Sequence, residues 1–442
     1  MFETFSEDTI YALATGFGKA AVAIIRISGQ RSADILAHVC PQAVFPERRA
    51  VFTAIRDLSG AILDRGLVLR FPAPRSFTGE DMVEFQITGS RAVVAEVMEM
   101  LSSFPRTRPA DAGEFARRAF KNGKLDLVEV EGLASVVEAE TRAQLDHAMR
   151  MADGELSQRS EEVRGLLLRA MAVLESAIDF SDVEDAANFS IAQILPWVKQ
   201  AHEMLADLMK NSTLSERLRE GMTVVIAGPP NVGKSTLLNY LAKRDVAIVS
   251  PLPGTTRDSL EVAAVVAGYP VTFVDTAGIR ETNDPIEALG IAHSRKWSKR
   301  ADVILWLSDG HYAPLPEEFA DRSILEVRTK ADIVEQGFLT PGAIAISAKS
   351  GRGIDELILK VAEFAKEYFA GVGHVAFGTE RQLRAARDAH SALRQILLEP
   401  ARAEELIAET LRQAVHAMSR LTGRIEVEEV LGEIFSRLCV GK

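Results

Sequence analysis

The spacing of hydrophobic positions divides the chain into segments with different predicted structures. In the N-terminal segment, the apolar runs Ala20–Ile27 and Ile62–Phe71 predict buried strands, and Ala92–Leu101 has the pattern of a helix. Hydrophobic and polar residues alternate over Met82–Ile87, which predicts a third strand with Glu84 on the face opposite its apolar side chains. The segment is therefore expected to form a compact α+β domain.

Beyond this segment, hydrophobic residues recur with the helical period of about 3.6 residues. The acidic stretch Asp179–Asp185 is expected to break the helices, and residues 222 to about 368 alternate strand and helix signals, as in a parallel α/β sheet. The sets with helical spacing are Leu133, Val136 and Val137; Leu167, Met171, Leu174 and Ile178; and Leu406, Ile407, Leu411, Val415 and Met418.

Helical segments on both sides of an α/β unit predict that this unit is inserted into a helical domain. The expected fold class is therefore multidomain, α/β and α. We predict an N-terminal α+β domain over residues 1–121, a discontinuous helical domain over residues 122–218 and 373–442, and an inserted α/β domain over residues 219–372.

Composition narrows the class of protein. The chain has 442 residues, enough for about three domains, and its hydrophobic content of 47% excludes a mainly disordered chain. The uncharged stretch Val262–Val274 is interrupted by Gly268 and Pro270, so it predicts two strands and a turn and not a membrane span. Cys40 and Cys439 are too few for a disulfide framework, and the acidic N-terminus does not suit a secretory signal. A cytoplasmic location is expected.

The charge balance bears on nucleic-acid binding. The net charge of −11 argues against a protein that coats nucleic acid through its overall charge, and it leaves a local basic patch open.

The strongest chemical signal is a phosphate-binding loop in the middle of the chain. The predicted strand Thr223–Ala227 runs into Gly228–Ser235, which has the pattern G-x-x-x-x-G-K-S, and the helix-like segment Thr236–Leu241 follows. Glycines allow the backbone N–H groups to surround phosphates, Lys234 can reach the β- and γ-phosphates, and the Ser235 hydroxyl can bind Mg²⁺. A second glycine-rich run, Gly16–Ala21, precedes a predicted strand, and we interpret it as a turn.

Further loops follow in the order expected of a Ras-like GTPase domain of the translation-factor type. Gly254–Asp258 offers a hydroxyl to Mg²⁺, and a buried strand ends in Asp275–Gly278, where Asp275 can hold the metal shell. The base-reading loop Thr329–Asp332 places a carboxylate where it can accept from two N–H groups of guanine, so Asp332 is expected to select GTP. Ser347–Lys349 resembles the loop that closes on the base.

Two positions depart from the usual pattern. Thr329 stands where the base-reading loop normally has Asn, and its shorter side chain is expected to weaken guanine binding or the tie to the phosphate loop. Ile279 stands where Ras-like enzymes place a water-orienting Gln, so another residue or a cation must orient water. Glu281 and Glu287 are nearby acidic candidates, although isolated acidic residues are usually solvated surface charges.

Over essentially its whole length the chain resembles the tRNA uridine-5-carboxymethylaminomethyl modification GTPases (MnmE, also called TrmE). The GTPase loops are shared with many GTPases, whereas an N-terminal motif combined with the C-terminal tail is more specific. The resemblance is carried by Gly228–Ser235, Gly254–Asp258, Asp275–Arg280, the Ser-Phe-Thr-Gly-Glu-Asp segment at 76–81, Lys-Leu-Asp-Leu at 124–127, and the Cys-Val-Gly-Lys tail at 439–442.

The resemblance implies a homodimer with a folate-binding, dimerising N-terminal domain. It implies work with a flavin-dependent partner, MnmG, in a heterotetramer that modifies the wobble uridine of certain tRNAs, using one carbon from a reduced tetrahydrofolate (formyl or methylene). The tRNA would be held mainly by the partner. Cys439 would be the cysteine of the C-terminal tail. It is a candidate catalytic residue, and its role in the family is unsettled. The implied folate site consists of Arg26, Glu84, Lys124 and Lys442.

The resemblance also implies activation by K⁺ when two GTPase domains meet face to face. Glu287 would then position the attacking water, and Asn231, Ser250, Leu252 and Thr255 would bind K⁺. Catalysis would rest on Glu287, Asp275 and Lys234, with Ser235 and Thr256 as Mg²⁺ ligands. The residues expected to bind GTP are Asn231, Val232, Gly233, Lys234, Ser235, Thr236, Ser250, Thr255, Thr256, Asp275, Thr276, Ala277, Gly278, Thr329, Lys330, Asp332, Ser347, Ala348 and Lys349.

The sequence therefore leaves two functions from different classes open. The first is a GTP-hydrolysing tRNA-modification enzyme. The second is a regulatory GTPase switch, such as a ribosome-assembly factor, in which the N-terminal domain is only a binding module.

Overall fold

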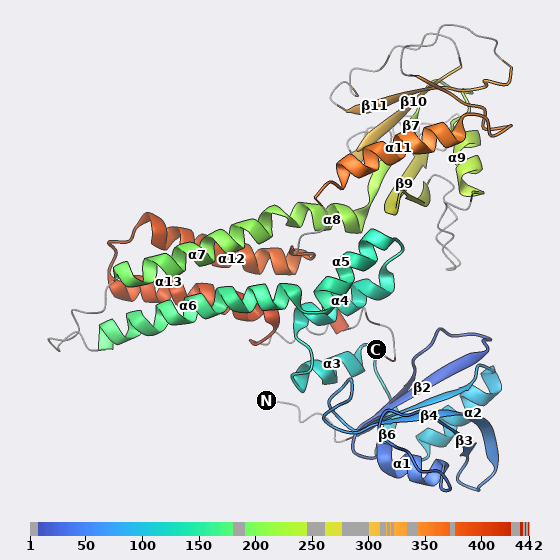
Figure 1. The fold of residues 1–442 in the computed structure, drawn as a ribbon, viewed down its shortest axis with the longest axis vertical. Helices are drawn as coiled ribbons and strands as arrows, with labels where there is room; N and C mark the ends of the chain where they lie inside the picture. The colour runs from blue at the N-terminus through green and yellow to red at the C-terminus, as the bar shows by residue number, and fades with distance from the viewer. Residues whose placement is uncertain are drawn as a thin grey trace, which may run out of the picture. The chain divides into compact units, whose positions relative to one another are not determined.

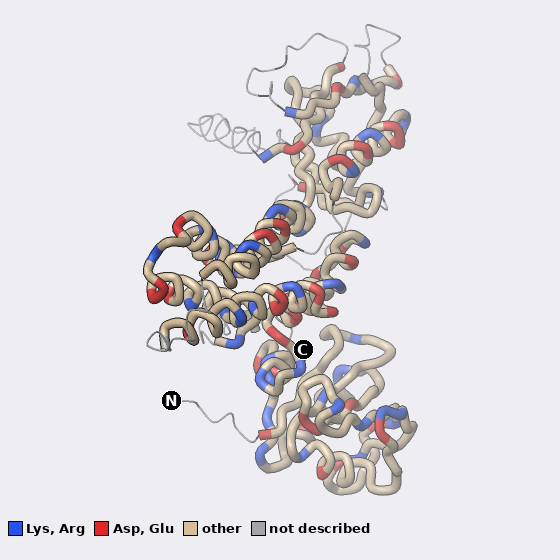
Figure 2. The backbone as a smooth tube through the Cα atoms, turned by 60° about the vertical axis from the view of Figure 1, so that its left-hand side comes forward, with Lys and Arg blue, Asp and Glu red and all other residues tan. Residues whose placement is uncertain are grey.

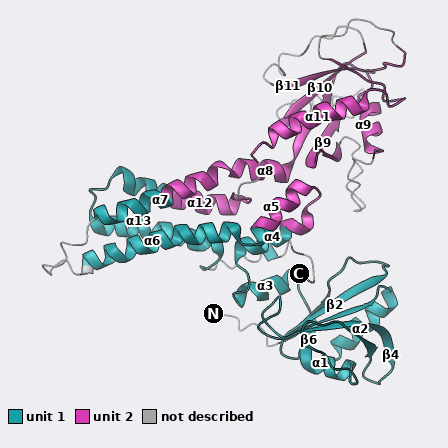
Figure 3. Cartoon of the chain, viewed as in Figure 1, with its two compact units in different colours: residues 1–134, 151–201, 391–442 teal, residues 135–150, 202–390 magenta. Residues whose placement is uncertain are grey.

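The computed structural model describes a defined part of the chain. The described residues are 8–179, 191–244, 261–275, 300–309, 315, 319, 322–333, 343–371, 376–425, 434–435, 438 and 441. The chain divides into two compact units, residues 1–134, 151–201 and 391–442 (unit 1) and residues 135–150 and 202–390 (unit 2), which Figure 3 colours separately.

Unit 1 contains a six-stranded sheet in the order β3-β4-β5-β2-β1-β6. Neighbouring strands are antiparallel, except that β1 and β6 are parallel. Helices α1 (Ser32–Val39) and α2 (Arg91–Ser102) contribute Ile35, Leu36, Val97 and Leu101 to the core of this sheet (Figure 1). The strands are β1 (Thr9–Leu13), β2 (Val22–Ser28), β3 (Val51–Arg56), β4 (Ile62–Phe71), β5 (Met82–Thr88) and β6 (Thr107–Pro109).

The three strands predicted in the N-terminal segment are present as β2, β4 and β5, whereas β1, β3 and β6 were not predicted. Strand β4 is not the buried strand that was expected, because only Gly66 and Val68 among its ten residues are buried. In β5, Val83, Phe85 and Ile87 are buried, and Glu84 on the opposite face is only half-buried. The turn predicted at Gly16–Ala21 connects two antiparallel strands, β1 and β2. The run therefore follows a strand as well as preceding one, and because it opens no helix, it lacks the context of a dinucleotide-binding loop.

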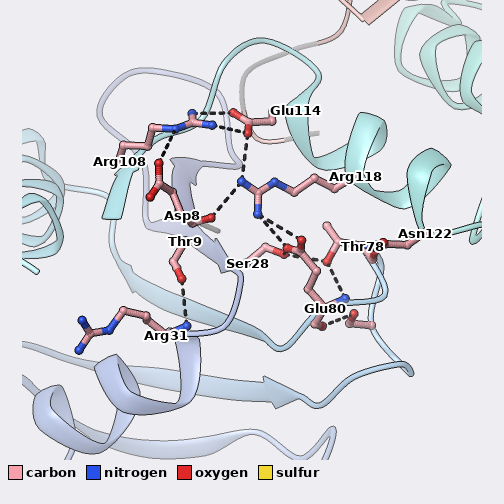
Figure 4. Close-up of polar contacts among 11 residues, drawn as sticks. Asp8, Thr9, Ser28, Arg31, Thr78, Glu80, Arg108, Glu114, Arg118 and Asn122 are labelled. Carbon is pink, nitrogen blue, oxygen red and sulfur yellow. Dashed lines mark hydrogen bonds and ion pairs between the residues drawn. The ribbon is translucent and has the colours of Figure 1, made fainter. Parts of the chain in front are cut away.

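Helix α3 (Glu114–Lys121) is attached to the unit 1 sheet through buried and half-buried ion pairs (Figure 4). Nη2 of Arg108 lies 2.7 Å and Nη2 of Arg118 3.1 Å from Oε1 of Glu114. Nη1 of Arg118 lies 3.0 Å from Oε2 of Glu80, which also accepts a hydrogen bond from the Ser28 hydroxyl at 2.7 Å. The network thus joins strands β2 and β6 and the 76–81 segment to one helix.

Glu114 is fully buried within this network, yet it remains acidic. Burial favours the neutral carboxyl, but the hydrogen bonds from Arg108 and from the Asp111 N–H, with the charge of Arg118, outweigh it and lower the pKa of Glu114 from its ordinary 4.5. Ionised Glu114 is therefore part of the folded structure of unit 1.

The remaining helices are mostly long. In unit 1, α6 and α13 pack side by side, with Leu167 and Leu174 of α6 and Ile407, Leu411 and Met418 of α13 buried (Figure 1). The bounds of these and the other long helices are α4 (Leu127–Glu138), α5 (Arg142–Ala152), α6 (Glu155–Asp179), α7 (Ile191–Lys210), α12 (Glu380–Leu398) and α13 (Glu404–Thr422).

One set of residues at helical spacing does not form the buried face of its helix. In α4, Val137 is 46% exposed and Leu133 and Val136 are half-buried, whereas Leu127 and Val130 are buried. The last two pack in a small core with Ala116 of α3 and with Phe435 and Leu438 of the C-terminal segment. Periodicity indicates which residues share a face, and the segments that pack against a helix decide which face is buried. For the same reason Leu406, which has helical spacing with the buried residues of α13, is 54% exposed.

Unit 2 contains a second six-stranded sheet, in the order β12-β11-β10-β7-β9-β8. All neighbouring pairs are parallel except β8–β9. This hairpin confirms the two strands and turn predicted for Val262–Val274. The strands are β7 (Met222–Ala227), β8 (Glu261–Val266), β9 (Tyr269–Asp275), β10 (Val303–Ser308), β11 (Ser323–Arg328) and β12 (Ile344–Ala345).

Within the described part of unit 2, the helices that accompany this sheet include α8 (Ser212–Glu220), α9 (Lys234–Ala242) and α11 (Ile354–Tyr368). Leu237 and Leu241 of α9 and Leu357 and Val361 of α11 pack in one core with Val224 and Ile226 of β7. Successive strands lie on either side of β7, at the point where the order of strands reverses. In parallel α/β sheets, ligands bind beyond the carboxyl ends of the strands at this point.

Both units carry charges of both signs on their surfaces. Figure 2 shows basic and acidic positions interspersed along the tube of each unit. Among the residues that the structure describes, none of the helices combines the length and the apolar character needed to cross a membrane.

Candidate functional site

The phosphate-loop sequence joins β7 to α9 in unit 2. The loop backbone has positive φ at Gly228 (149°), Asn231 (61°) and Gly233 (107°). At Gly228 a Cβ would lie 2.4 Å from the Leu307 carbonyl oxygen, so only glycine fits beside β10. The loop leads into the N-terminus of α9, whose unpaired N–H groups favour an anion.

The loop lysine is buried beneath the loop backbone. Nζ of Lys234 donates to the carbonyl oxygens of Gly228 at 2.9 Å and Pro229 at 2.8 Å, and the residue is 7% exposed. A cation is thereby held within the loop, where it can neutralise the phosphates of a nucleotide.

Ser235 and Asp275 meet at the carboxyl ends of neighbouring strands. The Ser235 hydroxyl donates to Oδ2 of Asp275 at 2.5 Å, and Asp275 is the last residue of β9, which pairs with β7. A hydroxyl and a carboxylate are the oxygen ligands that Mg²⁺ prefers, usually together with substrate phosphates. These two side chains therefore fit the predicted magnesium site.

The base-reading loop and the closing loop lie together at the same edge of the sheet. Thr329 directly follows β11, and the Ala331 N–H donates to the Ile346 carbonyl at 3.0 Å. The Ser347 hydroxyl hydrogen bond, together with the backbone and the charge of Lys349, lowers the pKa of Asp332. Asp332 is therefore an ionised acceptor, as recognition of the guanine N–H groups requires.

The unusual Thr329 makes a contact with the phosphate loop. Its hydroxyl lies 2.7 Å from the Val232 carbonyl oxygen, and Thr329 is 5% exposed. The side chain is thus long enough to reach the phosphate loop, one of the two interactions that its size was expected to weaken. The expected weakening of guanine binding stays a prediction.

A second candidate site lies on the unit 1 sheet. Arg26 of β2 and Glu84 of β5 occupy paired positions, with Nε of Arg26 2.9 Å from Oε1 of Glu84. The guanidinium lies over the rings of Phe77 (5.4 Å) and Phe115 (5.7 Å), which suits a cation–π interaction. The structure therefore brings Arg26 and Glu84 together in an aromatic environment.

The C-terminal tail reaches this second site. Nη1 of Arg26 donates to the Gly441 carbonyl at 3.0 Å. Gly441 has a φ of 105°, and a Cβ there would lie 2.6 Å from the Leu13 carbonyl, so the position requires glycine. Lys124 is exposed, and its side chain lies against the turn at Gly79.

Part of the predicted constellation lies outside the described residues. The magnesium, potassium and water-positioning predictions at Thr256, Ser250, Leu252, Thr255 and Glu287 therefore stay predictions. The same holds for Thr276, Ala277, Gly278, Cys439 and Lys442.

Three residues beside these sites were missed in the sequence. Asp309, directly after β10, lies with its Oδ2 3.0 Å from Nζ of Lys330, and Phe77 and Phe115 flank Arg26. Asp309 could have been found, because the carboxyl ends of parallel strands lie at one edge of a sheet. Phe77 lies in the motif already noted at 76–81, whereas no pattern marks Phe115.

Comparisons with known families match both ends of the chain. The family model described as "MnmE helical domain" matches residues 127–439, and the one described as "GTP-binding protein TrmE N-terminus" matches residues 9–124. Together they span nearly the whole sequence.

Individual relatives are similar over their full lengths. A protein from Rhodopseudomonas palustris named tRNA modification GTPase MnmE is 43% identical over 442 residues, which is 99% of each chain. One of the same name from Beijerinckia indica is 45% identical over 98% of this chain and 96% of its own. Among solved structures, Aquifex aeolicus Era bound to GDP and aluminium fluoride is 28% identical over 38% of this chain and 66% of its own, with a TM-score of 0.26, too low to support an argument.

Proposed function

The chain belongs to the MnmE family of tRNA modification GTPases, and from this membership we propose a complete activity. The protein is a K⁺-dependent GTPase that works with a flavin-dependent partner on the wobble uridine of certain tRNAs. A reduced folate donates one carbon to C5 of that uridine. The observation that carries the proposal is the meeting of Lys234, Asp275 and Thr329 at one edge of the unit 2 sheet, where β7, β9 and β11 end.

The GTP-hydrolysing part rests on the phosphate loop. Lys234 holds positive charge where the β- and γ-phosphates lie, and the α9 N-terminus and glycine-rich backbone bind their oxygens. Ser235, Asp275 and Thr256 would hold Mg²⁺, which when bound would neutralise charge on the phosphate oxygens. Asp332 accepts from the guanine N–H groups and so selects GTP.

Potassium activation accounts for the absence of a water-orienting Gln at Ile279. Two GTPase domains of a homodimer would meet through their phosphate loops, and K⁺ would take the place of an arginine finger. Support comes from Asn231, whose side chain is exposed and whose φ is 61°. The other proposed K⁺ ligands are Ser250, Leu252 and Thr255, and Glu287 would position the attacking water.

Folate binding is proposed for the Arg26 cluster of unit 1. Reduced folates combine a planar ring, which carries N–H donors, with a carboxylate tail. Arg26 offers a cation and Glu84 an acceptor, with side chains 21% and 15% exposed, beside the Phe77 and Phe115 rings. Lys124 and Lys442 would add positive charge for the carboxylates, and Cys439 would lie close by.

The partner is a flavin-dependent protein of the MnmG type. With a net charge of −11, this chain is better suited to share tRNA binding with a partner than to hold tRNA by its overall charge. We propose a heterotetramer in the cytoplasm, in which the partner makes most of the tRNA contacts.

The decisive experiment is mass spectrometry of tRNA nucleosides from a deletion strain. We expect the wobble-uridine modification to disappear and to return with the wild-type gene, but not with Lys234→Ala. The Lys243→Ala variant, which changes an exposed lysine after the end of α9, is the matched control and should restore it. Normal wobble uridines in the deletion strain would instead favour a GTPase switch such as a ribosome-assembly factor.

Potassium dependence has its own test. The rate of GTP hydrolysis should be higher in KCl than in NaCl at equal ionic strength, and Asn231→Ala should reduce the difference. Equal rates in the two salts would remove K⁺ from the proposal and leave the tRNA function standing.

A further inference from the structure

The contact between Thr329 and the phosphate loop fixes the direction of one backbone N–H group of that loop. Thr329 belongs to the base-reading loop, but its hydroxyl is joined to Val232, 97 residues earlier in the chain. Val232 is 1% exposed, and it lies between Asn231 and Gly233, whose φ angles are both positive. The contact therefore reaches the most sharply turned part of the phosphate loop.

The hydroxyl proton can be assigned from the neighbouring bonds. Oγ1 of Thr329 lies 2.7 Å from the Val232 carbonyl and 3.1 Å from the Ser308 carbonyl. The Ser308 carbonyl already accepts the Thr329 N–H at 2.7 Å. A hydroxyl has one proton, so it is donated over the shorter distance, to Val232.

The hydrogen bond from Thr329 to Val232 determines the direction of the Gly233 N–H. The Val232 C=O and the Gly233 N–H belong to one planar trans peptide unit, in which the two bonds point in opposite directions. Fixing the C=O on Thr329 therefore aims the Gly233 N–H away from the base-reading loop. Gly233 directly precedes Lys234 at the N-terminus of α9, where phosphate is expected.

We propose that Thr329 is a positioning residue for the phosphates of the nucleotide and not for its base. Its hydroxyl holds the Val232–Gly233 peptide in the orientation that presents the Gly233 N–H to a phosphate oxygen. The single hydroxyl proton is used in this bond, so Thr329 has no donor left for guanine, and base selection rests on Asp332. The inference goes beyond the proposed function, because it requires only the nucleotide site and neither K⁺, folate nor tRNA.

The test compares affinities of the full-length protein for GDP and 7-deaza-GDP, measured by calorimetric titration in Mg²⁺ buffer. A hydroxyl donor can contact guanine only at its acceptors, and 7-deaza-GDP lacks the N7 acceptor, so the ratio of the two affinities reports base contact by residue 329, and the affinities themselves report the phosphate site. In Thr329→Val, which has a similar shape but no hydroxyl, both affinities should fall about tenfold, with the ratio unchanged within about twofold.

Two variants separate the hydroxyl from its surroundings. Thr329→Ser keeps the hydroxyl and should stay within about threefold of the wild type. Thr410→Val is the matched control, because Thr410 is also buried and its hydroxyl donates to a backbone carbonyl, that of Leu406 at 2.8 Å in α13. It should bind both nucleotides like the wild type.

Several outcomes would overturn the proposal. A fall in the ratio of GDP to 7-deaza-GDP affinity in Thr329→Val would show a base-side role, and unchanged affinities would show no role. Equal losses in the Ser and Val variants would assign the effect to the methyl group. If Thr329→Val is misfolded by circular dichroism, Thr329→Asn decides: it supplies an N–H to Val232 and should bind GDP at least as tightly as the wild type, and a tenfold loss would contradict the inference.

Discussion

The two six-stranded sheets of this protein carry their candidate sites in different places. In unit 2 the site lies beyond the carboxyl ends of parallel strands, in the loops after β7, β9 and β11. In unit 1 it lies on side chains of paired antiparallel strands, where Arg26 of β2 meets Glu84 of β5. The site in unit 2 consists largely of backbone groups. The site in unit 1 consists of side chains and of one backbone carbonyl from near the C-terminus, that of Gly441.

This difference decides how each site can be recognised. The loops of unit 2 are contiguous runs of glycine, lysine and hydroxyl residues, since each loop must follow one strand. The pair in unit 1 is separated by 58 residues, and the Gly441 carbonyl by 415 residues from Arg26. A site formed by side chains on the face of a sheet (a face-built site) therefore has no local sequence pattern. Here only the family resemblance pointed to it.

The largest effect on activity is expected at the site that the unit 2 loops form (the loop-built site). Lys234→Ala removes the ammonium group that the loop carbonyls hold, so the rate of GTP hydrolysis should fall roughly 10²- to 10³-fold. Hydrolysis is measured as phosphate release, with Lys243→Ala as the control. A loss smaller than about threefold would show that the loop does not bind phosphate through this lysine.

The next effect is on the stability of unit 1. Glu114→Gln removes the buried carboxylate charge from both Arg108 and Arg118, so that Arg118 keeps only its pair with Glu80, and this should destabilise the unit by about 3 kcal/mol. Hydrogen–deuterium exchange of β2 and β5 measures this without assuming that the two units unfold together. The control Glu162→Gln breaks an exposed pair with Arg159 and should cost at most about 0.5 kcal/mol.

The lowered pKa of Glu114 predicts that the stability of unit 1 depends on pH. The pKa of Glu114 is lowered from 4.5 in the folded state, so its stabilising contribution is complete above about pH 4.5 and is lost as the pH falls through the lowered value. Protection of the unit 1 sheet should decline over that acid range in the wild type, and less steeply in Glu114→Gln. Parallel declines in both proteins would assign the acid sensitivity to other groups.

A smaller effect tests base reading in unit 2. Asp332→Asn replaces an ionised acceptor with an amide that can donate to the C2 carbonyl of xanthine, so the ratio of GTP to XTP affinity should fall roughly 100-fold. Competition binding measures the ratio. Asp355→Asn, which changes an 84% exposed carboxylate paired with Arg244, is the control and should leave the ratio unchanged.

The smallest effect is expected at the face-built site. Arg26→Ala removes a cation that contacts Glu84, two rings and the tail, and binding of a reduced folate should weaken about tenfold. Equilibrium dialysis measures it, with Arg56→Ala as the control, because Arg56 is a half-buried arginine of β3 that hydrogen-bonds to the Gly60 carbonyl of its own hairpin. Equal affinities in the two variants would move the folate site away from Arg26.

Local patterns predicted many elements well. Strand β4 has the predicted bounds, Ile62–Phe71, because its apolar run lies between turn residues. The short strand β1, Thr9–Leu13, was missed, because its five residues follow an acidic segment and have no pattern of their own. In α4 the residues at helical spacing do not form the buried face, since burial depends on contacts with α3 and with Phe435 and Leu438.

The sequence alone determined the family, the phosphate loop and Asp332, because these depend on residue types in contiguous order. Tertiary structure alone decided that Arg26 lies against Glu84 and Gly441, and that the Thr329 hydroxyl reaches Val232. Thr329 was read from the sequence as a shortened base-reading residue, and the fold turns its hydroxyl toward the phosphate loop. The physical reason is that hydrogen bonds between distant segments depend on strand order and register, which no single segment encodes.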